Sequence, residues 1–308
     1  MITTLAVLTS GGDAPGMNAV IAGVEEEARR RGLRVLAVRG GYRGLADGRI
    51  TELERGDARG HLAEPGTWLG SSRYPELPAA GGLMPGRAAL ERAGGDALAV
   101  IGGDGSLQGA RRFAASGTPV AFVPSTIDND VAGTARTVGM DSAVNYAVGV
   151  IDQLRITGRS LPGRGFVVQT LGGPTEHLAL AVAAAAAIDD VLVPARPFDL
   201  DRIAQHFVER ADAGEAIAVM SEGVGNAVDV AARLSELARL RVHPTILGHA
   251  QRAAPPTAFD RQLALSGGRT AAAALADGQS AFVAFTADGL PEPHDLEPGS
   301  PGQLRQAR

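Results

Sequence analysis

The chain has 308 residues, of which 45% are hydrophobic and 4% aromatic, and its formal net charge is −5. This size predicts one large or two medium globular domains, and the scattered negative charge gives no support to a nucleic-acid partner. The absence of cysteine excludes disulfides, thiol nucleophiles and cysteine–metal sites. All 29 basic residues are arginines, which excludes a Schiff-base lysine and the lysine of a P-loop. Short apolar runs and the lack of a charged leader lead us to expect a cytoplasmic protein without a membrane partner.

Strand and helix patterns alternate through the first half of the chain. Residues 3–10 are predicted as a strand, residues 19–32 as a helix and residues 33–40 as a second strand. The pattern recurs over residues 96–117 as a strand, a glycine turn and a helix, followed by a strand over residues 118–126. Such βαβ units predict a parallel sheet covered by helices on both faces, with ligands bound at the carboxyl ends of the strands.

The second half of the chain repeats this theme. Residues 163–173 and 215–225 are predicted as strands followed by glycine turns, and the alanine-rich residues 177–190 as a helix. The tail from residue 286 onward is rich in proline, glycine and charge, which predicts a surface segment or a partly disordered one. The whole pattern predicts an α/β protein.

Two glycine-rich turns follow predicted strands. Residues 10–16 (SGGDAPG) and 102–106 (GGDGS) carry small residues that let backbone N–H groups approach a phosphate beside the positive end of the next helix. Tight packing at a strand–helix junction is the alternative for the first segment, and a helix cap by Asp104 or Ser106 is the alternative for the second. The first turn is not GxGxxG, which disfavours dinucleotide binding. Two such turns at two strand ends favour phosphate binding more than either one alone.

Polar side chains follow the strand of residues 118–126. Thr126, Asp128 and Asp130 lie within five positions. Mg²⁺ takes one or two protein carboxylates beside phosphates, and a second carboxylate can act as a general base toward an attacking hydroxyl. An Asx-turn, which is common at strand ends, is an equally good interpretation of this stretch taken alone.

Further candidates for sugar-phosphate binding lie in the second half. His249 and Arg252 are three residues apart and share one face if the segment is helical. Together with Arg164 they could bind a sugar phosphate, and Glu222 could accept a sugar hydroxyl. Judged alone, the three basic residues are better explained as a solvated basic face, and Glu222 is better explained as part of a surface turn.

Taken together, these segments resemble the phosphofructokinases in order and spacing. The matching segments are LAVLTSGGDAPGMNAVI, GSSRYPE, VIGGDGS, PSTIDND, SEGV and TILGHAQR…DRQLA, which extend over residues 4–270. The resemblance implies two three-layer αβα domains with mainly parallel sheets. It implies a nucleotide-binding domain over residues 1–139 with about 252–290, and a sugar-phosphate-binding domain over residues 140–251 with the C-terminal tail.

The resemblance also implies roles for the matching residues. Asp128 is expected to be the catalytic base, with Thr126 and Arg73 beside it, and Asp104 and Asp130 are the expected Mg²⁺ ligands. The expected nucleotide-side residues are Gly11, Tyr42, Arg73, Gly103, Asp104, Gly105 and Ser106. The expected sugar-phosphate residues are Thr126, Asp128, Asp130, Arg164, Leu171, Gly172, Gly173, Glu222, His243, His249 and Arg252. Because Arg164 is similar to an arginine that reaches a neighbouring subunit, a homotetramer or homodimer is expected.

The phosphoryl donor can be predicted from two positions. Pyrophosphate-using relatives usually carry aspartate where this chain has Gly105, and aspartate there would crowd the α-phosphate of a nucleotide. Gly105 therefore favours ATP. Ser125 stands where those relatives carry lysine and is the usual residue of neither type. The resemblance thus implies an ATP- and Mg²⁺-dependent 6-phosphofructokinase-like enzyme of carbohydrate metabolism. The alternatives are a pyrophosphate-dependent enzyme and a non-catalytic regulatory paralogue that binds nucleotide or sugar phosphate.

The sequence departs from the family pattern mainly on the acceptor side. Gly173 replaces an arginine close to the transferred phosphate, whose loss should cost on the order of 10²-fold in rate. His243 replaces an arginine that helps to hold the 6-phosphate, and neutral histidine is the weaker ligand. Further changes are Ala135, Ala253 and Ala254. We therefore expect the acceptor to be fructose 6-phosphate or a related sugar phosphate of a specialised pathway.

The resemblance implies a further departure at the site that binds regulatory effectors. Ala22 and Glu26 stand where regulated relatives carry basic residues that bind an effector phosphate, although Arg55 and Arg155 remain. We expect little response to a nucleoside diphosphate or to phosphoenolpyruvate.

Overall fold

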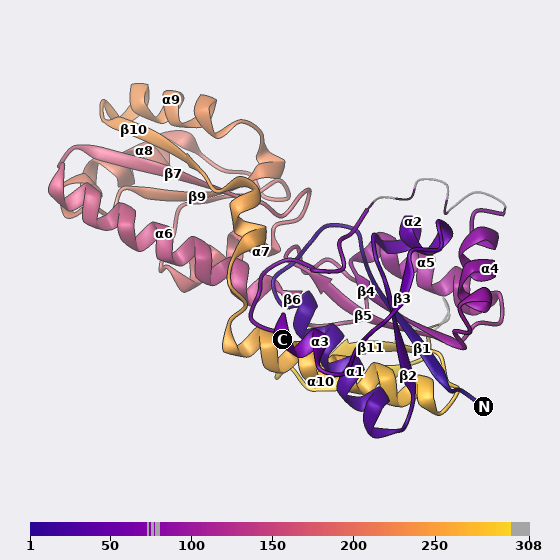
Figure 1. The fold of residues 1–308 in the computed structure, drawn as a ribbon. Coiled ribbons are helices and arrows are strands. Elements are labelled where there is room, and N and C mark those ends of the chain that lie inside the picture. The colour runs from indigo at the N-terminus through magenta and orange to yellow at the C-terminus, as the bar shows by residue number, and fades with distance from the viewer. Residues whose placement is uncertain (73, 75–76, 78–80, 297–308) are drawn as a thin grey trace. The chain divides into compact units, whose positions relative to one another are not determined.

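The computed structural model describes all residues except 73, 75–76, 78–80 and 297–308 (Figure 1). Internal contacts divide the chain into two units: Met1–Met140 with the chain from Pro255 onward, and Asp141–Ala254. Both units are α/β with mainly parallel sheets, which confirms the predicted fold class. The second unit is thus inserted between two parts of the first.

The first unit contains a sheet of eight strands in the order β12-β11-β5-β4-β1-β2-β3, with β6 paired to β5. Its strands are β1 (Thr4–Ser10), β2 (Arg34–Val38), β3 (Ile50–Glu52), β4 (Ala97–Gly102), β5 (Val120–Thr126), β6 (Val138–Gly139), β11 (Ala281–Phe285) and β12 (Pro291–His294). The strands β2, β1, β4 and β5 run parallel, with Ser10 opposite Gly102 and Gly102 opposite Pro124. The carboxyl ends of β1, β4 and β5 therefore lie side by side at one edge of the sheet.

Helices cover both faces of this sheet. They are α1 (Met17–Arg30), α2 (Gly41–Ala46), α3 (Asp57–Gly60), α4 (Met84–Arg92), α5 (Asp104–Ala115) and α10 (Ala258–Ala276). The helices α2, α4 and α5 pack on the face that carries Leu8, Val100 and Phe122, whereas α1 and α10 pack on the other. Every residue of β1 is buried, as expected of a parallel strand covered on both faces. The helices α1 and α10 pack closely, because a Cβ added to Gly23 would lie 2.4 Å from the carbonyl oxygen of Leu265.

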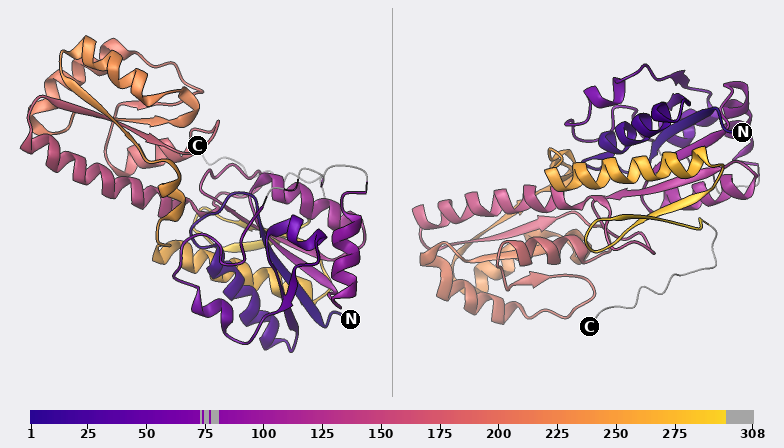
Figure 2. Two further views of the ribbon diagram at one scale, coloured as in Figure 1. Left: turned by 45° about the horizontal axis from the view of Figure 1, so that its top comes forward. Right: turned by 90° about the horizontal axis from the view of Figure 1, so that it is seen from below.

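The second unit contains a smaller, wholly parallel sheet in the order β10-β7-β9-β8. Its elements are α6 (Met140–Ser160), β7 (Arg164–Thr170), α7 (His177–Ala185), β8 (Val191–Leu192), α8 (Leu200–Arg210), η1 (Ala211–Ala213), β9 (Ile217–Ser221), η2 (Glu222–Val224), α9 (Ala227–Ala238), β10 (Arg241–Ile246) and η3 (Gly248–Ala253), where η denotes a 3-10 helix. The helices α8 and α9 pack on one face through Phe207 and Leu234, and α6 runs along the other side (Figure 2).

The structure differs from the sequence-based expectations in two places. The predicted helix over residues 177–190 ends at Ala185, and Ala187 has a left-handed backbone with φ of +52°. The tail was expected to join the second unit, but Pro291–His294 pairs antiparallel with β11, so for this part the expectation was wrong. The buried side chain of Leu296 holds the same segment on the core of the first unit. Among the described residues, no helix is both long and apolar enough to cross a bilayer.

Candidate active site

The loops that follow β1, β4 and β5 meet at the carboxyl edge of the first sheet. Gly11 follows β1 with φ of +87°, and a Cβ added there would lie 3.3 Å from the Ser106 hydroxyl. A Cβ added to Gly103 would lie 3.6 Å from Cβ of Thr126. The two glycine turns therefore contact each other, and the second contacts Thr126, where the aspartate loop (residues 126–130) begins, as the order of the strands predicts.

The amino end of α5 is open to a ligand. The helix begins at Asp104 with Gly103 as N-cap, and no side chain caps it. The interpretation of Asp104 or Ser106 as a helix cap was therefore wrong. Uncapped N–H groups and the positive end of the helix attract a phosphate group. Gly105 is exposed, and a Cβ added there would meet no atom within 4 Å.

Tyr42 supports this turn from inside the first unit. Its side chain is buried, its ring stacks on Phe113 with centroids 5.9 Å apart, and its hydroxyl donates to the carbonyl oxygen of Ser106 at 2.9 Å. Burial raises the pKa of Tyr42 well above its usual value, so the hydroxyl remains a donor at neutral pH. Tyr42 thus holds Ser106 in place, and its direct contact with a nucleotide stays a prediction.

Hydroxyl groups shape the aspartate loop after β5. The N–H of Asp128 donates to Oγ1 of Thr126 at 3.2 Å, and this hydroxyl donates to Oδ2 of Asp128 at 3.3 Å. The hydroxyl of Thr137 donates to the Thr126 carbonyl at 2.7 Å and to Oδ1 of Asn129 at 3.2 Å. Asn129 has a left-handed backbone with φ of +50°. The carboxylate of Asp128 is therefore oriented by Thr126, at the edge where the two glycine turns also end.

Asp104 and Asp130 fit a hard divalent cation. Both are exposed at the carboxyl edge of the sheet, and within the described parts of the chain neither carboxylate has a hydrogen-bond or ion-pair partner. The described residues contain no group of three or more His, Cys, Asp or Glu that could hold a metal. Mg²⁺ takes only one or two protein carboxylates and completes its shell with phosphates and water.

The second unit carries loops of its own at the carboxyl ends of β7 and β9. The N–H of Gly173 donates to Oε1 of Glu222 at 2.7 Å. The N–H of Leu171 donates to Oε1 of Gln251 at 2.9 Å, and the amide of Gln251 donates to the Ala143 carbonyl at 3.2 Å. Residues 171–173, Glu222 and the segment after β10 are therefore held together, as expected. Sequence analysis missed Gln251, a fully buried residue whose signal was its place between His249 and Arg252.

His249 and Arg252 lie in η3. A 3-10 helix has three residues per turn, so side chains at i and i+3 project from the same side. This confirms the expectation that the two residues share one face. His249 is exposed and Arg252 is half-buried.

Arg164 and His243 lie apart from these residues. Arg164 is the first residue of β7, whereas Leu171 follows its last residue. Six steps along a strand amount to about 20 Å. His243 is the third of the six residues of β10 and pairs in register with Phe166, the third residue of β7. One chain therefore does not bring Arg164 to the sugar-phosphate residues at the carboxyl ends, and His243 lies partway along the sheet. Arg73, expected beside the transferred phosphate, lies outside the described residues.

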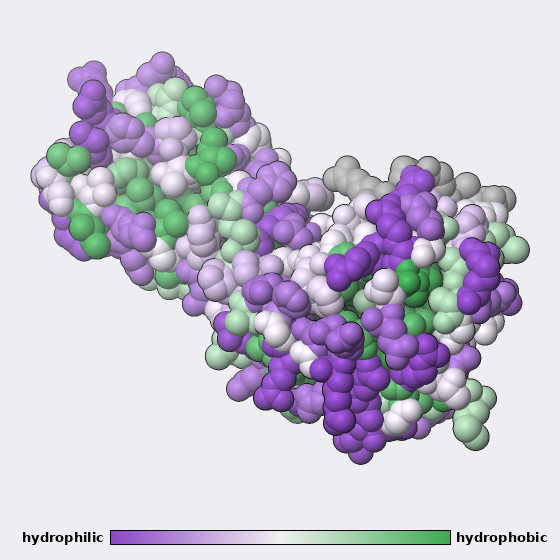
Figure 3. Space-filling view, viewed as in Figure 1, coloured by the Kyte–Doolittle hydropathy of each residue, from purple (hydrophilic) through white to green (hydrophobic). Residues whose placement is uncertain are grey.

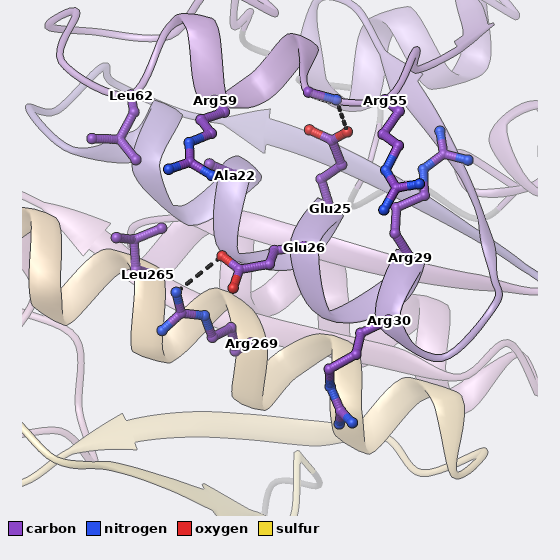
Figure 4. Close-up of a pocket in the computed structure, with 11 residues that line it drawn as sticks. Ala22, Glu25, Glu26, Arg29, Arg30, Arg55, Arg59, Leu62, Leu265 and Arg269 are labelled. Carbon is purple, nitrogen blue, oxygen red and sulfur yellow. Dashed lines mark hydrogen bonds and ion pairs between the residues drawn. The ribbon is translucent and has the colours of Figure 1, made fainter.

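A cavity of about 550 Å³ lies between α1, α3 and α10 (Figure 4). Its basic lining residues are Arg29, Arg30, Arg55, Arg59 and Arg269. Glu25 accepts hydrogen bonds from the N–H groups of Gly56 and Ala58, and Glu26 pairs with Arg269 at 2.9 Å. Hydrophilic residues gather over this part of the first unit (Figure 3). An effector phosphate would meet the carboxylate of Glu26 here, and the expected weak response to effectors stays a prediction.

A parallel α/β sheet with phosphate-binding turns at its carboxyl edge is typical of enzymes that act on phosphorylated ligands. Residues 4–275 match the family profile described as Phosphofructokinase. A curated relative from Streptococcus pyogenes serotype M1, named ATP-dependent 6-phosphofructokinase, is 42% identical over 285 residues, which cover 91% of this chain and 84% of the relative. The chain therefore belongs to the phosphofructokinase family.

Solved structures agree with this family assignment. Phosphofructokinase from Pichia pastoris in the T-state matches 96% of this chain and 35% of its own chain, with 29% identity and a TM-score of 0.86. The Saccharomyces cerevisiae phosphofructokinase matches 96% of this chain and 45% of its own, with 30% identity and a TM-score of 0.86. The present chain thus spans less than half the length of these two yeast chains. A pyrophosphate-dependent phosphofructokinase from Marinobacter aquaeolei, at 20% identity and a TM-score of 0.83, shares the fold.

Proposed function

We propose that this protein is an ATP- and Mg²⁺-dependent kinase that transfers the γ-phosphate of ATP to a hydroxyl of fructose 6-phosphate and forms fructose 1,6-bisphosphate. The observation that carries the proposal is the position of Asp128 on a loop that touches the turn at the uncapped amino end of α5. The 42% identical relative named ATP-dependent 6-phosphofructokinase supports the choice of donor and acceptor.

In the proposed reaction, Asp128 accepts the proton of the attacking hydroxyl. The hydroxyl oxygen forms a bond to the γ-phosphorus, and the bond from that phosphorus to the β–γ bridging oxygen breaks, so that ADP leaves. Thr126 keeps the carboxylate of Asp128 aimed, since it bonds both the N–H and Oδ2 of that residue. Positioning and charge stabilisation carry most of such a transfer. Asp104 and Asp130 would hold Mg²⁺, which neutralises charge on the phosphates.

The donor side favours ATP over pyrophosphate. A Cβ at Gly105 would point into open space beside the amino end of α5, so glycine leaves room for the α-phosphate of a nucleotide. The likeness to pyrophosphate-dependent structures concerns the fold alone. Gly11, Gly103 and Ser106 are the proposed phosphate contacts, and Arg73 is proposed to reach the transferred phosphate.

The acceptor side requires more than one subunit. Leu171, Gly172, Glu222, His249 and Arg252 are the proposed sugar-phosphate contacts of one chain. Arg164 starts from the opposite end of the same sheet, which supports its contribution from a neighbouring copy in a homotetramer or homodimer, and His243 is a further proposed contact with the sugar phosphate. We place the protein in the cytoplasm, in agreement with its lack of cysteine.

The test is a panel of sugar phosphates assayed with ATP and with pyrophosphate in the presence of Mg²⁺, read by phosphate transfer. We expect turnover with ATP and fructose 6-phosphate that is lost in Asp128→Asn. If the enzyme prefers another sugar phosphate, that compound is the acceptor in place of fructose 6-phosphate. If it prefers pyrophosphate, pyrophosphate is the donor in place of ATP. Tight binding of ATP without turnover on any acceptor would instead identify a non-catalytic paralogue.

A further inference from the structure

A polar segment crosses the loops that follow β1 and β2 in the first unit. Residues 67–72, called the strap here, hydrogen-bond to the ends of β1 and β2. The hydroxyl of Thr9 donates to the Gly70 carbonyl at 3.1 Å and lies 2.8 Å from the hydroxyl of Thr67. The N–H of Gly40 donates to the Leu69 carbonyl at 3.0 Å. Since Thr9 is fully buried, the strap is fixed to the interior of the unit and not only to its surface.

The strap is anchored by the only tryptophan of the chain. The backbone N–H of Trp68 donates to Oδ1 of the buried Asn18 at 2.9 Å. The guanidinium of Arg39 lies 5.0 Å from the Trp68 ring, and the His61 ring stacks on it at 4.5 Å with an interplanar angle of 14°. Asn18 lies in the first turn of α1, directly after the first glycine turn. Trp68 therefore couples the strap to the helix that this turn begins.

Two serines at the end of the strap hold the backbone of the loops beneath it. The hydroxyl of Ser71 donates to the carbonyl oxygen of Gly11 at 2.6 Å, and the hydroxyl of Ser72 donates to the carbonyl oxygen of Gly40 at 2.7 Å. Gly11 begins the phosphate turn after β1, and Gly40 caps α2, which carries Tyr42. The strap thus reaches both loops that flank the proposed nucleotide site.

The bond from Ser71 sets the direction of one peptide group. In a trans peptide the C=O of Gly11 and the N–H of Gly12 point in opposite directions within one plane. When Ser71 holds the carbonyl, the N–H of Gly12 is turned away from the strap. Gly12 is exposed, and its N–H has no hydrogen-bond acceptor among the described residues. An oriented, solvent-facing N–H at a glycine turn is a preorganised donor for a phosphate oxygen.

We propose that Ser71 is a positioning residue that turns the Gly11–Gly12 peptide toward the phosphates of the donor. The identity of the donor rests on the function proposed above. The placement of the peptide does not, because any phosphate chain at this turn meets the same N–H. Gly11 has a φ of +87°, a backbone conformation that glycine adopts readily and residues with a Cβ rarely adopt.

The experiment measures binding of MgATP, and separately of magnesium pyrophosphate, to the full chain by calorimetry and by Trp68 fluorescence without acceptor. Ser71→Ala should raise the Kd and the KM for MgATP about three- to tenfold, because the Gly12 N–H is no longer held in place for one hydrogen bond to a phosphate oxygen. The KM for the sugar phosphate should stay at its wild-type value, and the Tm should change no more than in the control variant described below. Ser71→Thr, which keeps the hydroxyl, should restore MgATP binding.

Ser160→Ala is the matched control, because its hydroxyl also donates to a backbone carbonyl, that of Ile156, on the exposed end of α6. The proposal is overturned if Ser71→Ala behaves like this control, if both substrates lose affinity equally with a lower Tm, or if Ser71→Thr fails to rescue. A wild-type chain that binds MgATP but transfers no phosphate would refute the proposed kinase activity. The binding measurements on Ser71→Ala would then still test the role of Ser71. A wild-type chain that binds neither phosphate ligand would overturn both.

Discussion

Replacing Gly173 by arginine tests directly why the acceptor side departs from its family. The resemblance implies that an arginine at this position lies close to the transferred phosphate. Gly173 has a φ of +56°, and a Cβ added there would meet no atom within 4 Å. Its N–H bond to Glu222 uses the backbone alone, so a side chain does not remove it. The same chain already holds an arginine in this conformation, Arg239 with φ of +54°.

Gly173→Arg should lower the stability of the fold and raise the catalytic efficiency, and these two effects are measured separately. The left-handed backbone costs an L-residue about 1–2 kcal/mol, which lowers the free energy of unfolding. Both the free and the substrate-bound enzyme are folded, so this cost cancels from catalysis. A hydrogen bond between charged groups contributes about 1.5–3 kcal/mol, which corresponds to about 10- to 100-fold. We therefore expect kcat/KM for fructose 6-phosphate to rise by that factor while the Tm falls by a few degrees.

Steady-state kinetics with saturating MgATP would measure this change. Gly173→Gln is the control, because it carries the same backbone strain and a polar side chain without the charge. If Gly173→Arg and Gly173→Gln turn over fructose 6-phosphate equally, the missing positive charge does not limit the reaction. That result would refute the reasoning and favour an acceptor other than fructose 6-phosphate.

Three further predictions follow from the described contacts. Asp128→Asn should lower kcat about 10²- to 10⁴-fold and leave the Kd of MgATP within threefold of wild type, and substantial turnover would contradict its role as base. Gly109→Ala would place a methyl group 2.6 Å from Cζ of Tyr42, so urea unfolding should show a loss of about 1–3 kcal/mol, and an unchanged midpoint would mean that the ring moves freely. Hydrogen bonds and ion pairs to two arginines at the end of α1 lower the pKa of Glu27 from 4.5 to about 2. The ionised Glu27 carboxylate stabilises the fold above its ordinary pKa, and this stabilisation is lost as pH falls from about 4.5 towards 2. We therefore expect the free energy of unfolding of wild type to exceed that of Glu27→Gln by up to about 1 kcal/mol at neutral pH, and this difference to shrink over that pH range.

The sequence was sufficient for features that depend on short stretches. The strand before Gly11, the strand that ends at Gly102 and the loop that follows Thr126 were predicted at their observed positions, whereas Asp104–Ser106 of the predicted turn already belong to α5. Each stretch couples an apolar run to glycine or aspartate within a few residues, and this pairing is visible along the chain. The alternation of such units also predicted parallel sheets, because parallel strands need a crossover between them.

Features that depend on distant segments could not be predicted in this way. Nothing near Ser71 in the sequence indicates that its hydroxyl meets Gly11, which lies sixty residues earlier. Nothing near Gln251 in the sequence indicates that its buried side chain bridges Leu171 and Ala143. The polar tail that forms β12 was predicted as a surface segment since its pairing with β11 is a backbone interaction with little side-chain signal.

The sequence by itself determined the family, the parallel α/β fold and the residue types gathered for phosphate chemistry, because these follow from local periodicity and from motifs of a few residues. Only the tertiary structure decided how each residue serves that chemistry. It buries Tyr42 under Ser106, separates Arg164 from Glu222 along the length of one sheet and ties the strap to the first glycine turn. The reason is physical: strand order and register bring together side chains that are far apart in the chain, and these are set by the packing of the whole unit.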